Sequence, residues 1–313
     1  MKERGVFWLL GLTFLGIWGL TFSLNSWDKI NAARQQLVER IPRVEKKILN
    51  LGELLAAQRL SNGRTLKRYA DRLAAQHPES ADLINALSME ATTDGRLYQG
   101  LLERMRALRQ SIPGDGADYE AFTEPLSELE RLTGAAAPSE FNRALADPVN
   151  VLADLSGGQL RRVDAVSERA EAAAPGYVDY GAGRQLVGNP AYGEWRTESS
   201  GQTFWHWYGQ YVLFRTLFGG PIGYSGWAGG RGYSYYHDWG RGNYTSPGQR
   251  RTQHAVHTRA RNKFSGSGRN FASPYARQRS GASAAVARTK MRSPAASSRS
   301  ASLFASRGSA RGK

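Results

Sequence analysis

A repeated spacing of apolar residues early in the chain limits the fold more than any other feature of the sequence. Between Lys29 and Leu60, apolar residues follow one another at intervals of three or four positions. They are Ile30, Ala33, Leu37, Ile41, Val44, Ile48, Leu51 and Leu55. This period places them on one face of an α-helix, and that face needs other apolar surface to cover it. The sequence therefore predicts a mainly α-helical protein.

Two questions about this apolar stripe stay open at the level of sequence. Pro42 lies within it, so either the helix kinks there or a second helix begins there. The spacing is also nearly that of a heptad repeat, which favours a coiled coil over residues 29–60. In that case residues 30–55 could join copies of the chain into a homo-oligomer; otherwise the rest of the chain covers the stripe.

Further helices are indicated after this segment. Residues 97–112 show the same periodicity, and weaker patterns occur at 122–132 and 141–155. Short connections rich in Gly, Asn and Pro separate the patterns. Residues 28–175 are therefore expected to form an antiparallel helical bundle.

The sequence LSGGQ at Leu155–Gln159 matches the signature of ABC-type ATPases. Such an ATPase also needs a GxxxxGK[ST] loop, because that loop's amides and lysine hold the phosphates. The sequence has no such loop. We therefore interpret Gly157 and Gly158 as the end of one helix, with the next helix over Gln159–Ala173.

The N-terminus has the composition of a membrane span. Gly5 to Leu24 is a run of twenty residues without a charge, about the length that crosses a bilayer. A cleaved signal peptide is the alternative, but Thr21-Phe22-Ser23 is a poor cleavage site. Residues 1–27 are therefore predicted to be an uncleaved signal-anchor of the inner or plasma membrane, with the body on the non-cytoplasmic side. One anchor before a helical bundle resembles the LemA-like envelope proteins in layout alone.

The chain changes character after Pro175. Residues 176–248 hold 18 of the 33 aromatic residues and 17 of the 35 glycines, so few aliphatic side chains are left for an ordinary core. Within this aromatic, Gly-rich segment (176–249), Phe204, Trp207, Tyr211 and Phe214 recur at helical spacing. An amphipathic helix over 203–218 is expected, with its aromatic face either in a membrane interface or against the bundle.

An Arg-Gly-aromatic theme follows at Gly229–Tyr244. Such a sequence can stack on nucleobases or sugars, or it can be a loop whose rings are held on a neighbouring surface. The residues predicted for membrane-interface contact or aromatic stacking are Phe204, Trp207, Tyr208, Tyr211, Phe214, Tyr233, Tyr235, Tyr236 and Trp239.

The C-terminal part is strongly basic. Residues 251–313 contain 14 Lys or Arg and no Asp or Glu, so they carry almost all of the chain's net charge of +15. With few large apolar residues, the tail over 250–313 is expected to be disordered and to bind polyanions. The predicted polyanion-binding residues are Arg251, Arg259, Arg261, Lys263, Arg269, Arg277, Arg279, Arg288, Lys290 and Arg292.

Candidates for a metal site or for catalysis are few. His254 and His257 have a metal-ligand spacing, but they lie among arginines without a third ligand. His237-Asp238 could form an acid/base pair, although a local hydrogen bond is the simpler interpretation. With no cysteine in the chain, thiolate metal sites are excluded. We expect no metal, no cofactor and no catalytic residue.

Paired carboxylates give no stronger signal for catalysis. Glu194 with Glu198, and Glu168 with Glu171, are explained as solvated surface residues.

These observations favour a non-enzymatic, single-pass envelope protein in a scaffold or interaction role, whose basic tail contacts anionic polymers or lipid headgroups. The alternative is a membrane-tethered nucleic-acid-binding module, if the tail is cytoplasmic. A minor alternative is an envelope hydrolase using Glu194, His206, His237 and Asp238.

Overall fold

The computed structural model describes residues 4–165, 167–174, 177–217, 220–265, 280 and 282–283. Side chains are described from residue 26 onward, except those of residues 168, 217 and 265. This part of the chain is mainly helical and contains one two-stranded antiparallel sheet. The predicted helical class is therefore confirmed.

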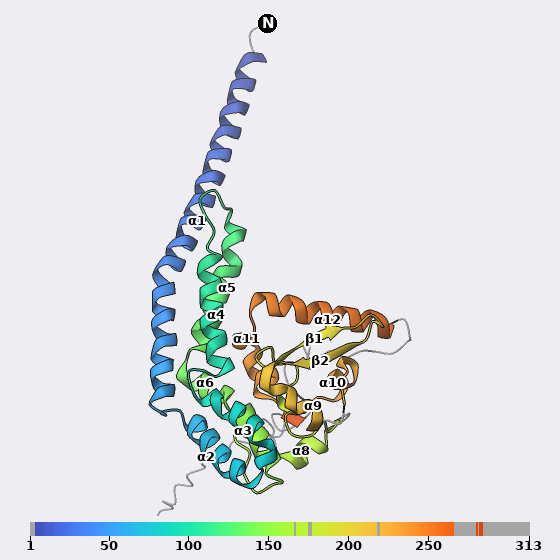
Figure 1. Ribbon diagram of the computed structural model, residues 1–313. Helices are drawn as coiled ribbons and strands as arrows, with labels where there is room; N and C mark the ends of the chain where they lie inside the picture. The colour runs from blue at the N-terminus through green and yellow to red at the C-terminus, as the bar shows by residue number, and fades with distance from the viewer. Residues whose placement is uncertain are drawn as a thin grey trace, which may run out of the picture.

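The first half of the chain forms a helical bundle (Figure 1). Helices α4 and α5 lie alongside α1, and shorter helices gather near the C-terminal end of α1. The helices are α1 (Arg4–Ala56), α2 (Ser61–Gln76), α3 (Ala81–Ser88), α4 (Arg96–Gln110), α5 (Tyr119–Ala135), α6 (Pro138–Ala144) and α7 (Ala146–Leu155). Short 3-10 turns follow α2 and α3 at Pro78–Ser80 and Met89–Ala91.

Helix α1 buries the predicted apolar stripe within the chain. Leu37, Leu51 and the other stripe residues from Ala33 to Leu55 are at most 5% exposed, and Ile30 is half-buried. Helices α4 and α5 both contact α1, so the stripe belongs to the core of the bundle, and association of copies through residues 30–55 stays a prediction. The helix also continues through Pro42, so the idea of a second helix beginning there is wrong.

One close approach fixes α1 against α4. The Tyr98 hydroxyl donates to the carbonyl oxygen of Ile48 at 3.2 Å. The ring passes so near Gly52 that a Cβ there would lie 2.4 Å from the Tyr98 oxygen. A side chain at position 52 would therefore force the Tyr98 ring to move.

The backbone of Gly5–Leu24 is helical as part of α1, but its side chains lie outside the described ones. Among the residues that the structure describes, no helix has both the length and the apolar character needed to cross a bilayer.

The second half of the described chain, residues 177–265, forms what we call the aromatic lobe (Figure 1). Its strands are β1 (Gly193–Thr197) and β2 (Thr203–Trp207), and its helices are α9 (Phe214–Leu217), α10 (Tyr224–Gly230), α11 (Arg241–Tyr244) and α12 (Pro247–Ser265). Single turns of 3-10 or π type occur at Arg184–Leu186, Gly209–Leu213 and Tyr236–Gly240. Helix α8 (Glu168–Ala172) lies in the connection from the bundle.

Aromatic rings replace aliphatic side chains in the core of this lobe. The Trp195 ring centroid lies 5.1 Å from that of Trp205, 4.9 Å from that of Tyr224 and 5.0 Å from that of Trp227. The first two pairs meet edge to face, which suits the ring quadrupoles. The segment that is poor in aliphatic side chains therefore builds its core from aromatic rings.

The predicted helix over 203–218 is wrong. Thr203–Trp207 is strand β2, and it pairs antiparallel with β1 so that Trp205 lies opposite Trp195. Only Phe214–Leu217 is α-helical within the predicted span, and Phe218 lies outside the described residues. Tertiary packing of alternate residues such as Trp205 overrides the local helical spacing.

The basic tail is not disordered from its start. Residues 247–265 form helix α12, with Gln253 and Val256 buried on the lobe. The Gln253 amide donates to the Tyr236 hydroxyl at 2.9 Å and its oxygen accepts from Arg241 at 2.8 Å. These polar contacts are not visible in an apolar pattern, which explains the error.

The LSGGQ turn ends helix α7, as predicted. Gly157 and Gly158 adopt φ values of +60° and +89°, in the left-handed region that favours glycine. The following helix is much shorter than predicted, because only Glu168–Ala172 is helical. The chain between them is instead held by Arg162, whose guanidinium contacts Asp154 at 2.7 and 2.8 Å.

Buried carboxylates fasten the aromatic lobe to the bundle. Asp147 of α7 accepts hydrogen bonds from the backbone of Tyr235 at 2.7 Å and of Tyr236 at 3.0 Å, and from the Ser234 hydroxyl at 2.9 Å. Burial raises the pKa of the Asp147 carboxyl to about 7, although these three hydrogen bonds oppose the rise. The lobe is therefore positioned by polar contacts as well as by rings.

Glu171 makes the second of these connections. Its side chain is buried and accepts from Arg162 at 2.6 Å, from Arg184 at 3.1 Å and from the backbone of Tyr233. The prediction that Glu171 is a solvated surface residue is wrong, because two guanidinium groups compensate its charge inside the protein. The Glu168 side chain lies outside the described ones.

Candidate anion-binding pocket beside helix α12

Helix α12 carries the described part of the predicted polyanion-binding set. Arg251, Arg259, Arg261 and Lys263 are all exposed on it. The helix contains no acidic residue and runs along the upper edge of the aromatic lobe in Figure 1. The remaining predicted residues, Arg269, Arg277, Arg279, Arg288, Lys290 and Arg292, lie outside the described part.

The exposed cations of α12 are not equivalent. Arg251 forms an ion pair with Glu124 of α5 at 2.9 Å, so its charge is already compensated. Arg259 donates to the neutral hydroxyl of Thr197 at 2.5 Å and keeps its full charge available. Lys263 follows Arg259 by one helical turn, which places the two cations on the same face.

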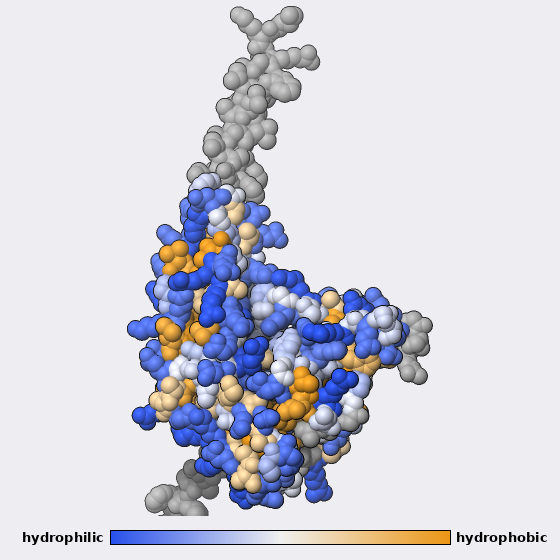
Figure 2. Space-filling view, in the orientation of Figure 1, coloured by the Kyte–Doolittle hydropathy of each residue, from blue (hydrophilic) through white to orange (hydrophobic). Residues whose placement is uncertain are grey.

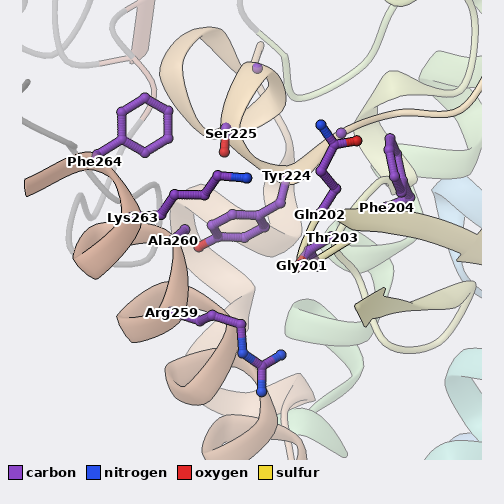
Figure 3. A pocket seen from close by; sticks show the side chains of 12 residues that line it. Gly201, Gln202, Thr203, Phe204, Tyr224, Ser225, Arg259, Ala260, Lys263 and Phe264 are labelled. Carbon is purple, nitrogen blue, oxygen red and sulfur yellow. The ribbon is translucent and has the colours of Figure 1, made fainter. Parts of the chain in front are cut away.

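A pocket of about 400 Å³ opens beside Arg259 and Lys263 (Figure 3). Helix α12 supplies these two cations with Phe264, the hairpin supplies residues 201–204, and helix α10 supplies residues 224–226. In Figure 3 the Lys263 ammonium extends over the pocket toward Ser225 and the ring of Tyr224. The hairpin is joined to α12 beside the pocket by the hydrogen bond from Arg259 to Thr197.

The lining combines three kinds of side chain. Two are cationic, Gln202, Thr203 and Ser225 are neutral and polar, and Phe204 supplies an aromatic face. None of the described residues that line the pocket is acidic. An anionic ligand with a ring or flat apolar face would meet complementary charge and a stacking partner here.

The surface around this helix differs from that of the bundle. In Figure 2 the visible region of α12 is largely blue and white, whereas orange apolar side chains are more frequent along the bundle. Trp27, Val38 and Leu49 are among the apolar side chains that α1 exposes. The polar character fits a binding surface for a hydrated, charged ligand.

Strand β2 is accessible from its other side as well. A second cavity of about 280 Å³ is lined by Glu198, Phe204, His206, Trp207 and Arg215, among other residues. Phe204 lines both cavities, so the two adjoin at its ring. This second cavity is mixed in charge, unlike the pocket beside α12.

The structure divides the predicted aromatic set. Phe204, Trp207 and Tyr208 are half-buried, and Trp239 is 46% exposed. By contrast, five members are buried and therefore unsuited to a membrane interface or to stacking on a ligand, which corrects their predicted role. They are Tyr211, Phe214, Tyr233, Tyr235 and Tyr236.

Buried tyrosines are held by polar partners of the bundle. The Tyr211 hydroxyl donates to Glu90 at 2.7 Å, and burial followed by the Glu90 charge raises its pKa. Glu90 is fully buried and also accepts from the backbone of Arg96 and Leu97 at the start of α4. Burial raises the pKa of Glu90, and these hydrogen bonds oppose that rise.

The His237-Asp238 pair does not form an accessible acid/base pair. His237 is buried and its Nε2 lies 2.8 Å from the Val187 carbonyl oxygen, while burial and then Arg231 lower its pKa well below the usual value. Asp238 instead contacts Arg231 at 2.6 Å and the Ser283 hydroxyl at 2.6 Å. Both residues belong to the core of the lobe.

Glu194 and His206, the other two residues of the hydrolase hypothesis, lie opposite each other in the β-hairpin. Glu194 accepts from Arg196 at 2.6 Å. The buried His237 and Asp238 belong to a different environment, so the structure does not bring the four residues together as one accessible site.

His254 and His257 lie on α12. No group of three or more His, Asp or Glu with metal-ligand geometry occurs among the residues that the structure describes.

Several residues of the pocket were not anticipated from sequence. Gln202, Thr203, Ser225 and Phe264 reach it only because the hairpin and α10 fold against α12. The available signal was the spacing of Arg259 and Lys263, which predicts a shared helical face once the segment is recognised as a helix.

The chain matches no protein-family model, and no curated protein or solved structure shows significant similarity to it.

Proposed function

We propose that the chain is a non-enzymatic, membrane-anchored envelope protein that binds an acidic glycan through the pocket beside α12. The observation that supports this most is the pairing of Arg259 and Lys263 with the ring of Phe204 in a pocket whose described lining has no carboxylate. Sugar rings carry apolar faces that stack on aromatic side chains, and uronic or sulfated sugars add the negative charge.

Charge would supply most of the affinity for such a ligand, and the shape of the pocket would supply selectivity. Cations that contact a polyanion release its condensed counterions, so affinity falls as salt rises. Gln202, Thr203 and Ser225 offer hydrogen bonds to sugar hydroxyls from the same pocket. Further cations of residues 266–313 would extend contact along the polymer, because no acidic residue occurs there.

The membrane anchor is the second part of the proposal. It is supported by the uncharged run from Gly5 to Leu24. Topology can be tested with the cysteine-free chain by introducing Ser302→Cys and adding a membrane-impermeant maleimide to cells with a permeable outer layer. Labelling before lysis is expected. Labelling only after lysis would place the tail in the cytoplasm and contradict an envelope ligand.

Nucleic acid is a weaker candidate ligand. That hypothesis relied on the Arg/Gly/Tyr segment, but Tyr233 and Tyr235 are buried and Arg231 pairs with Asp238. The segment therefore offers few rings for stacking on bases. The pocket beside α12 alone does not favour nucleobases over sugars.

The direct test compares ligands for the full chain in detergent. Binding to polygalacturonate is expected to be saturable and to weaken steeply between about 50 and 200 mM salt, whereas neutral dextran should not bind. RNA is expected to bind more weakly at matched charge concentration, because Tyr233 and Tyr235 of the Arg/Gly/Tyr segment are buried and cannot stack on bases. Equal or tighter binding of RNA would replace the acidic glycan by nucleic acid, and binding of dextran would contradict the charge argument.

A further inference from the structure

The second cavity beside strand β2 differs in charge from the pocket beside α12. Its volume is about 280 Å³, and its lining includes one carboxylate, Glu198, and one guanidinium, Arg215. Small-molecule sites in proteins typically have volumes of about 300–1,000 Å³, so this cavity lies near the lower end of that range. It is therefore of a size that suits a small molecule better than a polymer.

The two charged residues of the second cavity come from different elements. Glu198 directly follows strand β1 in the hairpin, and Arg215 belongs to helix α9. Both are exposed, and neither makes an ion pair or a side-chain hydrogen bond with another of the described residues. A carboxylate and a guanidinium that line one cavity without pairing leave space between them for a ligand that carries both opposite charges.

Apolar side chains supply another part of the lining. Trp207 of β2 is half-buried, and Val212 is 49% exposed. The Trp207 ring is held by buried neighbours, because its centroid lies 4.9 Å from that of Phe214 and 5.7 Å from that of Trp205. A fixed ring with accessible surface can pack against the apolar part of a ligand at a low cost in entropy.

Backbone contacts fix one edge of the second cavity. The Trp205 N–H donates to the carbonyl oxygen of Ile222 at 2.9 Å, and Phe204 forms a β-bridge with Gly223. Pro221 and Ile222, which line the cavity, are therefore held along strand β2. The polar side chain of His206 comes from the same strand and offers a hydrogen bond to a ligand.

Charges of both signs select against ligands with a single charge. Arg215 would attract an anion that Glu198 repels, and the reverse holds for a cation. A neutral ligand would leave both charges without a partner in the cavity. A zwitterion satisfies both, because its ammonium can meet the carboxylate while its carboxylate meets the guanidinium.

We propose that the second cavity binds a small zwitterion with an apolar body, which is the chemistry of apolar amino acids and dipeptides. Glu198 binds the ammonium, and Arg215 binds the carboxylate through its planar fork of donors. The apolar body packs against Trp207. This inference goes beyond the proposed glycan binding, since neither Arg259 nor Lys263 takes part in it.

The test measures the binding of L-leucine to the full chain in detergent by isothermal titration calorimetry. Two derivatives each lack one charge: N-acetyl-leucine has no ammonium, and leucinamide has no carboxylate. Leucine is expected to bind saturably. Each derivative should bind about fivefold more weakly, because it loses one partly exposed ion pair.

Two substitutions assign the charges of the ligand to the cavity. Glu198→Gln should remove the preference for leucine over N-acetyl-leucine, and Arg215→Gln should remove the preference over leucinamide. Both positions are exposed, so neither change should unfold the protein. Arg196→Gln is the matched control, because Arg196 is an exposed arginine of the same hairpin that pairs with Glu194 and is not part of the lining.

A parallel titration with the dipeptide Leu-Leu identifies the source of the zwitterion. Competition between the dipeptide and leucine supports the site in either case. Tighter binding of leucine would assign a free amino acid, and tighter binding of Leu-Leu would assign a peptide, whose charged ends lie farther apart.

Three results would overturn the proposal: no saturable binding of leucine or Leu-Leu, an unchanged preference in Glu198→Gln or Arg215→Gln, or an equal loss of preference in Arg196→Gln. Lys263→Gln should leave the affinity for leucine unchanged. The second cavity can therefore be confirmed or rejected whether or not the pocket beside α12 binds a glycan.

Discussion

The helical bundle and the aromatic lobe are stabilised in different ways. In the bundle, aliphatic side chains such as Leu37 and Leu51 repeat at helical spacing and form a continuous core. In the lobe, short elements surround Trp195, Trp205 and Trp227, and buried carboxylates fasten them to the bundle. A segment poor in aliphatic residues can therefore still fold when aromatic rings and compensated charges replace them.

The largest expected effect comes from removing a ring of the lobe. Trp227 is 1% exposed and contacts Trp195, so Trp227→Ala should lower the free energy of unfolding by about 3–5 kcal/mol. Because the two regions are stabilised separately, the tryptophan fluorescence of Trp227→Ala should change at a lower urea concentration than its helical circular dichroism signal. Trp239→Ala, at a 46% exposed position, is the control with little expected change.

Coincident fluorescence and dichroism transitions in Trp227→Ala would contradict the separate stabilisation of the two regions. They would show that the bundle and the lobe unfold as one cooperative unit.

A smaller loss is expected at the charged connection. Glu171→Gln leaves Arg162 and Arg184 only partly compensated, so stability should fall by about 3 kcal/mol in urea unfolding. Glu194→Gln, which alters a more exposed ion pair with Arg196, should cost less than about 1 kcal/mol. Equal effects of the two substitutions would contradict a structural role for the buried carboxylate.

A more gradual effect is expected from pH. The stability of the protein should depend on pH through the carboxyl group of Asp147. Its pKa is raised from 3.8 to about 7 in the folded protein, so the folded state keeps a proton that the unfolded chain has released. Stability from this group is therefore fully present below about pH 4 and falls as pH rises toward 7, by about 1.4 kcal/mol per unit at most. Asp147→Asn should flatten this part of the pH profile, as measured by urea unfolding between pH 4.5 and 7.5. An unchanged profile would exclude Asp147 as its source.

The bundle could be predicted from sequence because the spacing of its apolar residues shows directly which face of each helix is buried. The stripe residues from Ala33 to Leu55 are all buried, as a helical face requires, and α1 contacts both α4 and α5. The spacing of the stripe could not show which surface covers it. That surface proved to be this chain's own helices, with Pro42 accommodated inside one continuous helix.

The lobe was harder to predict because its aromatic residues fit both the spacing of a helix and the alternation of a strand. Phe204, Trp207, Tyr211 and Phe214 satisfy a helical spacing, yet Trp205 and its partner Trp195 make the contacts that decide the structure. Helix α12 was missed because its buried side chains include Gln253, whose contacts to Tyr236 and Arg241 are polar.

The candidate site was predicted in part. Arg259, Lys263 and Phe204 were all singled out from sequence, but for separate surfaces. They line one pocket only because the β1–β2 hairpin packs beside α12, and local sequence patterns indicated neither element.

The most direct test of the central claim is the affinity for polygalacturonate of a double variant, Arg259→Gln with Lys263→Gln, measured over a salt series beside Arg251→Gln. If the pocket binds the glycan, the double variant should bind at least tenfold more weakly and with a salt slope smaller by about two, whereas the control should stay close to the unchanged protein. An unchanged affinity and slope in the double variant would contradict binding at this pocket.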